Sequence, residues 1–392
     1  MAPITAYYWQ RSAQGLLGRA VNGAELTING RGPNAGEIFR NPGLGRTLRA
    51  LAEGGKEAYY QGEIAGAIVA VIGEAGGCMA PGDLAAHTST WTQPISTTYR
   101  GLRIWECPPN GQGLAALMAL NILEGFDLGA LPALSAGRLH LEIEAMRLAF
   151  ADARRYVADP QLSPAPLEGL LDKAYAAERG KLINLRRANP QITYGTPPGS
   201  SDTVYLSVVD GEGNACSFIN SNYMGFGTGI VPRGWGFSLQ NRGHNFSLDP
   251  AHPNALAPGK RPYHTIIPAM ATYAADDRLY ASFGVMGGFM QPQGHMQVVV
   301  GLADDALDPQ AALDRPRFCI EPDEARSTTA LEEGIPVAVM AQLAEMGHAV
   351  TPVSGMGRSL FGRGQIIRRD PETGVLCGGS DPRADGCAMA LY

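Results

Sequence analysis

The sequence lacks the residue patterns that hold metal ions or build disulfide frameworks. Its seven histidines form no HExxH motif and no pair at helical spacing. No CxxC motif occurs, and the six cysteines are widely scattered, so buried free thiols are the default expectation. Zinc-finger, thiol-redox and metalloprotease sites therefore have no support. The cysteines are Cys78, Cys107, Cys216, Cys319, Cys377 and Cys387.

The sequence also lacks a membrane-spanning run and a recognisable leader. The longest apolar run, Ile64–Ile72, is far too short to cross a bilayer. The first residues have no basic start followed by an apolar core, so they do not form a secretory signal. The chain as given is therefore expected in the cytoplasm, or in the periplasm or outside the cell if a segment upstream of it is missing.

Charged residues are few, at 17%, while hydrophobic residues reach 45%, which is typical of a globular protein. The length of 392 residues suits two or more domains or one large layered domain. The formal net charge of -6 argues against nucleic acid or an anionic membrane as the main partner. The 50 glycines and 28 prolines indicate many turns.

Helical patterns dominate the first half and strand patterns the second, with a change of composition at 186–202. The Gly-rich turn Pro108–Gly113 leads into a helix, so its backbone N–H groups can bind an anion, although close packing is the favoured explanation of the glycines. Helices are expected at 44–54, 58–72, 114–123, 136–157, 167–185, 308–313 and 331–346, a hairpin at 94–105, and strands at 203–220, 263–273 and 278–286.

The stretch that follows this composition change has the pattern of a β-hairpin. Val204, Leu206 and Val208 alternate with Tyr205 and Ser207, and the turn Asp210–Gly213 separates them from the returning strand. Thr203 at the start of this strand has two interpretations. Threonine is simply common in strands. Alternatively, cutting the bond between residues 202 and 203 would place a hydroxyl and a free α-amine on one residue, which is a nucleophile with its own base.

A series of short motifs runs in order from about residue 40 to the C-terminus. The motifs are Asp83-Leu84-Ala85, Tyr99-Arg100-Gly101, Pro108-Pro109, Tyr156–Pro160, Thr203–Asp210, Phe226–Val231, Lys260-Arg261-Pro262, Met286-Gly287-Gly288, Asp314–Arg317 and Gly378–Gly386. Together they resemble the γ-glutamyltransferase family of N-terminal nucleophile hydrolases. The resemblance implies an α+β fold, the four-layer α/β/β/α sandwich of that superfamily.

The resemblance also implies roles for individual residues. Thr203 would be the nucleophile and would drive cleavage of the chain between Asp202 and Thr203. The N–H groups of Gly287 and Gly288 would form the oxyanion hole, since glycine lets a backbone approach an oxyanion closely. Ser221 would support the threonine amine. The reaction would need no metal and no organic cofactor.

The expected substrate-binding positions depart from the γ-glutamyl pattern. Asn245 stands where an aspartate is expected, so the partner for a substrate ammonium group is lost. Tyr223 replaces an asparagine, and His264-Thr265 replaces a carboxylate-binding Ser-Ser pair. Arg242 is an additional cation that would clamp a carboxylate on a different acyl group, with a surface cation as the alternative. These changes are similar to those of oxamate amidohydrolases and cephalosporin- or glutaryl-type acylases.

The resemblance divides the chain into residues 1–202, the latter part of a large-subunit-like segment, and residues 203–392, a small-subunit-like catalytic segment. The family's large segment normally begins well upstream of Met1, so its N-terminal part is expected to be lacking. The expected partners are a small amide substrate and the two processed segments bound to each other as a heterodimer, with no nucleic acid and no membrane. The rival hypothesis is a truncated, non-catalytic remnant that no longer cleaves itself.

Overall fold

The computed structural model describes residues 1–190, 192, 201–321 and 328–391. The chain forms two compact units. Unit 1 comprises Met1–Trp91 and Ser221–Arg242, and unit 2 comprises Thr92–Asn220 and Gly243–Tyr392. Each unit therefore takes chain from both sides of Thr203. The division into segments 1–202 and 203–392 concerns cleavage of the chain and not these units, and it stays a prediction.

Unit 1 is built from helices together with the later segment 221–242. The helix α2 (Pro42–Tyr60) begins at Asn41, whose side chain accepts a hydrogen bond from the N–H of Leu44 at 2.9 Å. The same side chain donates to the carbonyl of Gly236 at 2.7 Å, which attaches the later segment to the helix. The remaining elements are α1 (Pro3–Ser12), η1 (Ala13–Leu17), η2 (Gly23–Leu26), α3 (Glu63–Glu74) and α4 (Pro81–Ala85).

The centre of unit 2 is a six-stranded antiparallel sheet with the order β1-β2-β5-β6-β10-β11. Its strands are β1 (Ile95–Tyr99), β2 (Leu102–Glu106), β5 (Ala269–Tyr273), β6 (Leu279–Met286), β10 (Arg363–Arg369) and β11 (Leu376–Ser380). The expected hairpin at 94–105 is confirmed, with its turn at Arg100 and Gly101, which both have positive φ. The strand expected from residue 263 begins only at Ala269.

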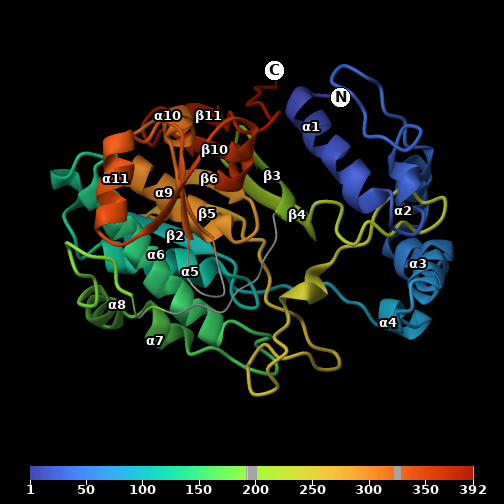
Figure 1. Cartoon of the computed structure of the whole chain (residues 1–392). Helices are drawn as coiled ribbons and strands as arrows, with labels where there is room; N and C mark the ends of the chain where they lie inside the picture. The colour runs from blue at the N-terminus through green and yellow to red at the C-terminus, as the bar shows by residue number, and fades with distance from the viewer. Residues whose placement is uncertain (191, 193–200, 322–327, 392) are drawn as a thin grey trace. The chain divides into compact units, whose positions relative to one another are not determined.

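Helices cover one side of this sheet (Figure 1). The helix α5 (Gly113–Leu123) is buried along its whole length, as its nearly unbroken apolar sequence predicts. Beside it lie α6 (Ala136–Tyr156), which confirms the helix expected at 136–157, and α9 (Met290–Ala303). The expected helix 167–185 is divided into α7 (Leu167–Leu171) and α8 (Lys173–Gly180), with the Asp172 side chain capping α8.

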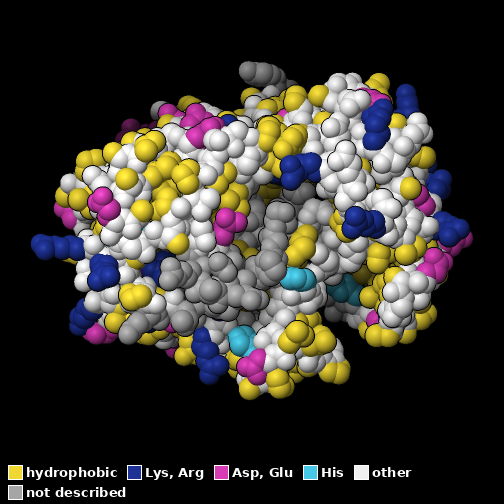
Figure 2. Space-filling model, viewed as in Figure 1, with side chains coloured by type: hydrophobic (Ala, Val, Ile, Leu, Met, Phe, Trp, Pro, Cys, Tyr) yellow, Lys and Arg dark blue, Asp and Glu magenta, His cyan; other side chains and the backbone are white. Residues whose placement is uncertain are grey.

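The predicted hairpin is confirmed as β3 (Ser201–Val209) and β4 (Ala215–Met224), a two-stranded sheet. It packs on β6 and β10 of the large sheet. Helix layer, six-stranded sheet and two-stranded sheet are the α/β/β part of the expected sandwich, and the mixed α+β class is confirmed. The apolar side chains of the hairpin reach the surface, since Val204, Leu206, Val208 and Phe218 are 43% to 67% exposed. Figure 2 colours the hydrophobic side chains at the surface yellow.

A third sheet completes unit 2. It consists of β7 (Phe318–Glu321), β8 (Thr328–Glu332) and β9 (Ala349–Val353). The helix α10 (Pro309–Asp314) precedes β7, α11 (Val337–Glu345) connects β8 to β9, and η5 (Gly355–Phe361) follows β9. The helix expected at 331–346 begins only at Val337, because its first residues belong to β8 and pair with β7. None of the helices in the described ranges is long and apolar enough to span a membrane.

Four buried charged side chains join this third sheet to the end of the chain. Arg383 donates from Nε and Nη2 to the two Glu332 oxygens, each at 2.6 Å, and from Nη1 to Asp381 at 3.0 Å. Arg317 binds Asp381 at 2.9 Å. All four side chains are at most 2% exposed. The two guanidinium groups lower the pKa of Asp381, although burial alone would raise it. We call Arg317, Glu332, Asp381 and Arg383 the buried charge cluster.

Replacing Arg383 by alanine should lower the free energy of unfolding by about 3–5 kcal/mol, because Glu332 and Asp381 would each lose a buried partner. Urea denaturation followed by circular dichroism measures the change. Arg278→Ala is the control, since Arg278 and Asp276 form an exposed ion pair and such pairs contribute about 1 kcal/mol or less. Equal losses in the two variants would contradict a stabilising role for the cluster.

Candidate functional site

Thr203 lies on the inner face of the hairpin, buried to 3% exposure. The register of that face is visible at two points. The Ser207 hydroxyl contacts the Ser282 hydroxyl at 2.5 Å, and the Tyr205 ring fills the place of a side chain at Gly284, where a Cβ would lie 2.6 Å from Cε2. Each step of two residues along β3 thus corresponds to two residues along β6. The next step places Thr203 at the level of Met286, the residue before Gly287.

Gly287 and Gly288 form the turn between β6 and α9, with φ values of 138° and 59° that favour glycine. Their carbonyls accept hydrogen bonds from the N–H groups of Met290 (3.0 Å) and Gln291 (3.1 Å) in the first turn of α9. In a planar trans peptide the N–H points opposite to the preceding C=O. The N–H groups of Gly288 and Phe289 therefore point away from the body of the helix.

This turn is suited to binding an anion. Within the described part of the chain no acceptor is recorded for the N–H of Gly287, Gly288 or Phe289. The turn also stands at the N-terminus of a 14-residue helix, where the unpaired N–H groups and the helix dipole favour negative charge. Fixed N–H donors of this kind are the groups from which an oxyanion hole is built.

Buried polar side chains that the sequence analysis missed lie under this turn. Gln112, at 0% exposure, donates to the carbonyl of Gly288 at 2.7 Å and to that of Thr265 at 2.7 Å. His295 accepts the N–H of Val285 on Nε2 at 3.0 Å, so its proton lies on Nδ1, 2.6 Å from a Glu106 oxygen. Gln112 belongs to the Gly-rich turn 108–113, which the sequence analysis singled out as able to bind an anion. The residues that Gln112 contacts could be found only from the tertiary structure.

Three predicted substrate-binding residues lie in unit 2 with Thr203 and the glycines. His264 accepts the N–H of Gln112 on its carbonyl (3.1 Å) and donates its own N–H to Asn110 (2.8 Å). Thr265 follows it and is fully buried. The amide of Asn245 donates to the carbonyl of Tyr263 at 3.0 Å, two residues before Thr265. One hydrogen bond thus links Asn245 to the segment that carries His264 and Thr265.

The other predicted residues lie in unit 1. Arg242 is 5% exposed and donates to the Ser221 hydroxyl at 3.1 Å. Its guanidinium carbon lies 5.4 Å from the centre of the Tyr223 ring. Burial lowers the pKa of Arg242 to about 10, so the group remains charged at neutral pH. The interpretation of Arg242 as a surface cation is wrong. Of the cleavage pair, Thr203 is described, whereas the side chain of Asp202 lies outside the described residues.

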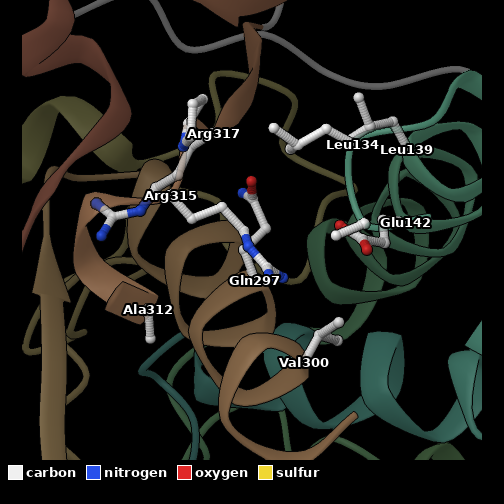
Figure 3. Close-up of a pocket in the computed structure, with 10 residues that line it drawn as sticks. Leu134, Leu139, Glu142, Gln297, Val300, Ala312, Arg315 and Arg317 are labelled. Atoms are coloured by element: carbon white, nitrogen blue, oxygen red, sulfur yellow. The ribbon is translucent and has the colours of Figure 1, made fainter. Parts of the chain in front are cut away.

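A separate small pocket lies between α6, α9 and the segment around Arg315, and it contains none of the predicted site residues (Figure 3). Glu142 on α6 and Gln297 on α9 reach into it. Burial raises the pKa of Glu142 to about 7, against the lowering effect of Arg138, which donates to it at 3.2 Å. The lining residues are Ala133, Leu134, Leu139, Glu142, Gln297, Val300, Ala312, Arg315, Pro316 and Arg317.

Glu142 should make stability depend on pH. Because its pKa in the folded chain is about 7 and its ordinary value is 4.5, the fold favours the protonated form. This contribution is complete below pH 4.5 and is lost as the pH rises through 7. In the wild type this effect should lower the free energy of unfolding by on the order of 2 kcal/mol between pH 5 and pH 8. We expect this decrease to be absent in Glu142→Gln. Urea denaturation at both pH values tests this, with exposed Glu345→Gln as control; an unchanged slope in Glu142→Gln would contradict it.

Comparisons with known proteins agree with these observations. The family model "Gamma-glutamyltranspeptidase" matches residues 1–391. The glutathione hydrolase-like YwrD proenzyme of Bacillus subtilis (strain 168) is 36% identical over 372 residues, which cover 93% of this chain and 69% of that protein. The oxamate amidohydrolase proenzyme of Klebsiella pneumoniae is 34% identical over 363 residues, covering 92% of this chain and 67% of that protein. The chain thus spans about two thirds of the length of these relatives.

The fold is also found among solved structures. Cephalosporin acylase from Bacillus halodurans superimposes with a TM-score of 0.90 at 45% sequence identity. The match covers 100% of this chain and 71% of the acylase. The family model and the relatives extend over nearly the whole sequence, and this structural match has the same extent. The chain belongs to the γ-glutamyltranspeptidase family, a family of enzymes that includes hydrolases and acylases.

Proposed function

We propose that this chain is a self-cleaving amidohydrolase that works through an acyl ester of Thr203. In the first reaction the Thr203 hydroxyl attacks the carbonyl carbon of Asp202. The peptide bond becomes an ester as the nitrogen takes the hydroxyl proton, and water then hydrolyses the ester. The products are a new carboxylate on Asp202 and a free α-amine on Thr203. A free α-amine has a pKa of about 7.7–8.0, so it can serve as a base near neutral pH.

The same hydroxyl would then act on the substrate amide. The α-amine takes the Thr203 proton while the hydroxyl oxygen attacks the amide carbon, and the N–H groups of the Gly287-Gly288 turn stabilise the negative oxygen. The tetrahedral intermediate releases the amine, which receives the proton, and leaves the acyl group on the threonine oxygen. Water, or an amine acceptor, then releases the acyl group. The observation that carries this proposal is the register of β3 on β6, which brings Thr203 to the level of that turn.

The acyl group that fits best carries a carboxylate but needs no α-ammonium group. Asn245 offers an amide in place of the carboxylate that would pair with an ammonium, and that amide is engaged with Tyr263. Arg242 is a buried cation that suits a substrate carboxylate. The relatives' names, an oxamate amidohydrolase and a cephalosporin acylase, favour this class. The second candidate is γ-glutamyl hydrolysis, which the name of the glutathione hydrolase-like relative favours.

Self-cleavage is the first test. Purified wild-type protein should yield a fragment whose N-terminal sequence is Thr203-Val204-Tyr205, because the hydroxyl and the scissile bond belong to adjacent residues. Thr203→Ala should give no such fragment, and Thr203→Ser should retain slower cleavage, since it keeps a hydroxyl. Intact mass spectrometry and N-terminal sequencing measure the outcome.

Thr328→Ala is the matched control, because Thr328 also begins a strand but lies outside the predicted site. It should be cleaved like the wild type. A single uncleaved species in the wild type, under conditions where relatives mature, would support the non-catalytic remnant. Cleavage that persists in Thr203→Ala would contradict the assignment of the nucleophile.

Acyl specificity is the second test. Arg242→Gln should lower kcat/KM for glutaryl and oxamate amides by about 10- to 150-fold, the effect of losing about 1.5–3 kcal/mol of charge-assisted hydrogen bonding. A neutral acyl amide of equal length should lose little. Exposed Arg233→Gln in the same unit is the control. A wild-type preference for γ-glutamyl amides would show instead that Asn245 and His264 do not set the specificity.

A further inference from the structure

The amide of Gln112 connects three segments of the candidate site in unit 2. Its nitrogen donates to Gly288 in the turn before α9 and to Thr265 in the segment that precedes β5, each at 2.7 Å. Its oxygen accepts the Tyr263 hydroxyl at 3.3 Å. The orientation of the amide is set by these partners, because only the nitrogen side can face two carbonyls. Gln112 thus uses both of its N–H groups on backbone oxygens of the site.

The contact with Gly288 decides where the neighbouring N–H groups point. The Gly288 carbonyl receives two donors, the Gln112 amide and the N–H of Gln291. In a planar peptide this fixes the following N–H, that of Phe289, in the opposite direction. Glycine tolerates either sign of φ, so without side-chain contacts a Gly-Gly turn has more than one accessible peptide orientation. A buried carbonyl that lost both donors on rotation would be left unsatisfied, which opposes that rotation.

Two further buried side chains, both on α9, accept backbone N–H groups close to this turn. Gln291 accepts the N–H of Ile267 at 3.1 Å, and His295 accepts the N–H of Val285 at 3.0 Å. Both are at most 1% exposed. The first contact joins α9 to the segment before β5 and the second joins α9 to β6, whereas Gln112 contacts a carbonyl of the turn itself. Gln112 is therefore the side chain whose loss would act most directly on the peptide between Gly288 and Phe289, and so on the N–H of Phe289 in this turn.

We propose that Gln112 is a positioning residue that holds the Gly287-Gly288 turn in the orientation needed to stabilise the oxyanion. It touches neither the substrate nor the nucleophile in this scheme, and it acts through the Gly288 carbonyl. The inference rests on the proposed function, since it assigns Gln112 a part in that same reaction. It also explains why a glutamine follows the glycine of the turn 108–113: its amide is the group that reaches Gly288.

The test replaces Gln112 by glutamate, which has the same shape but, when ionised, turns two donors into a charge facing two carbonyls. At pH 8 we expect kcat to fall by about 10²–10³-fold, the effect of losing one oxyanion donor, with KM changed by no more than about threefold. A protonated glutamate regains one donor, and burial raises its pKa. The ratio of variant to wild-type kcat should therefore rise at least about tenfold as the pH is lowered from 8 to 6.

Gln297→Glu is the matched control. Gln297 also donates to two backbone carbonyls, those of Gln293 (3.0 Å) and Phe318 (3.1 Å), but it does not touch the Gly287-Gly288 turn. Its ratio to the wild type should be constant over this pH range. A Gln112→Glu variant that keeps the wild-type kcat, or that follows Gln297→Glu at every pH, would overturn the proposal. If the variant matures too slowly for kcat to be measured, the same ratios are taken from its self-cleavage rates.

Hydrogen exchange separates this proposal from the proposed function. If the wild type itself is inactive, the proposed function fails, and the positioning role is then read from the amides of Met290 and Gln291, which bond to the turn carbonyls. Faster exchange there in Gln112→Glu alone supports the role, and equal exchange in both variants overturns it. If Gln112→Glu does not fold, Gln112→Asn replaces it, because it keeps a neutral amide but withdraws the donors by one methylene.

Discussion

The contact between the Tyr205 ring and Gly284 determines where the candidate nucleophile lies. The ring occupies the space above β6 that a side chain at position 284 would fill, so the hairpin can approach the large sheet only at this register. The hydrogen bond between Ser207 and Ser282 repeats the same register one step further along. A shift of one residue would turn Thr203 to the opposite face of the hairpin. The chemistry proposed at the Gly287-Gly288 turn therefore depends on the packing of one tyrosine ring against one glycine.

Much of the fold could be predicted from local patterns. The hairpin at 201–224 and the long helix at 136–156 follow from alternation and helical spacing, which depend on neighbouring residues alone. Alternation does not say which face is inward. In the hairpin the apolar Val204 and Leu206 point outward, while Tyr205 faces the sheet. That assignment depends on the partner strand, where Gly284 provides the space.

The candidate site was predictable only in part. Thr203, Gly287 and Gly288 could be named because their motifs resemble those of a family; in the structure Thr203 lies on β3, which packs on β6, and the two glycines follow β6. The polar side chains under the turn could not. Gln112 is 176 residues from Gly288 in the chain, and nothing in the sequence around either residue indicates the contact. The sequence alone could not decide whether Arg242 is a carboxylate-binding residue or a surface cation; its burial excludes the second interpretation.

The buried charge cluster has a consequence for how this sequence can diverge. Its two cations and two carboxylates are satisfied only as a set, so any single neutral replacement passes through a state with an unpaired buried charge. The effects of substitutions at the four positions should therefore be strongly non-additive. A library that varies one position at a time would find every position intolerant of substitution. Simultaneous replacement of all four residues by apolar residues of similar volume should be tolerated better. Epistasis, and not the chemistry of any one side chain, should therefore limit substitution at these four positions.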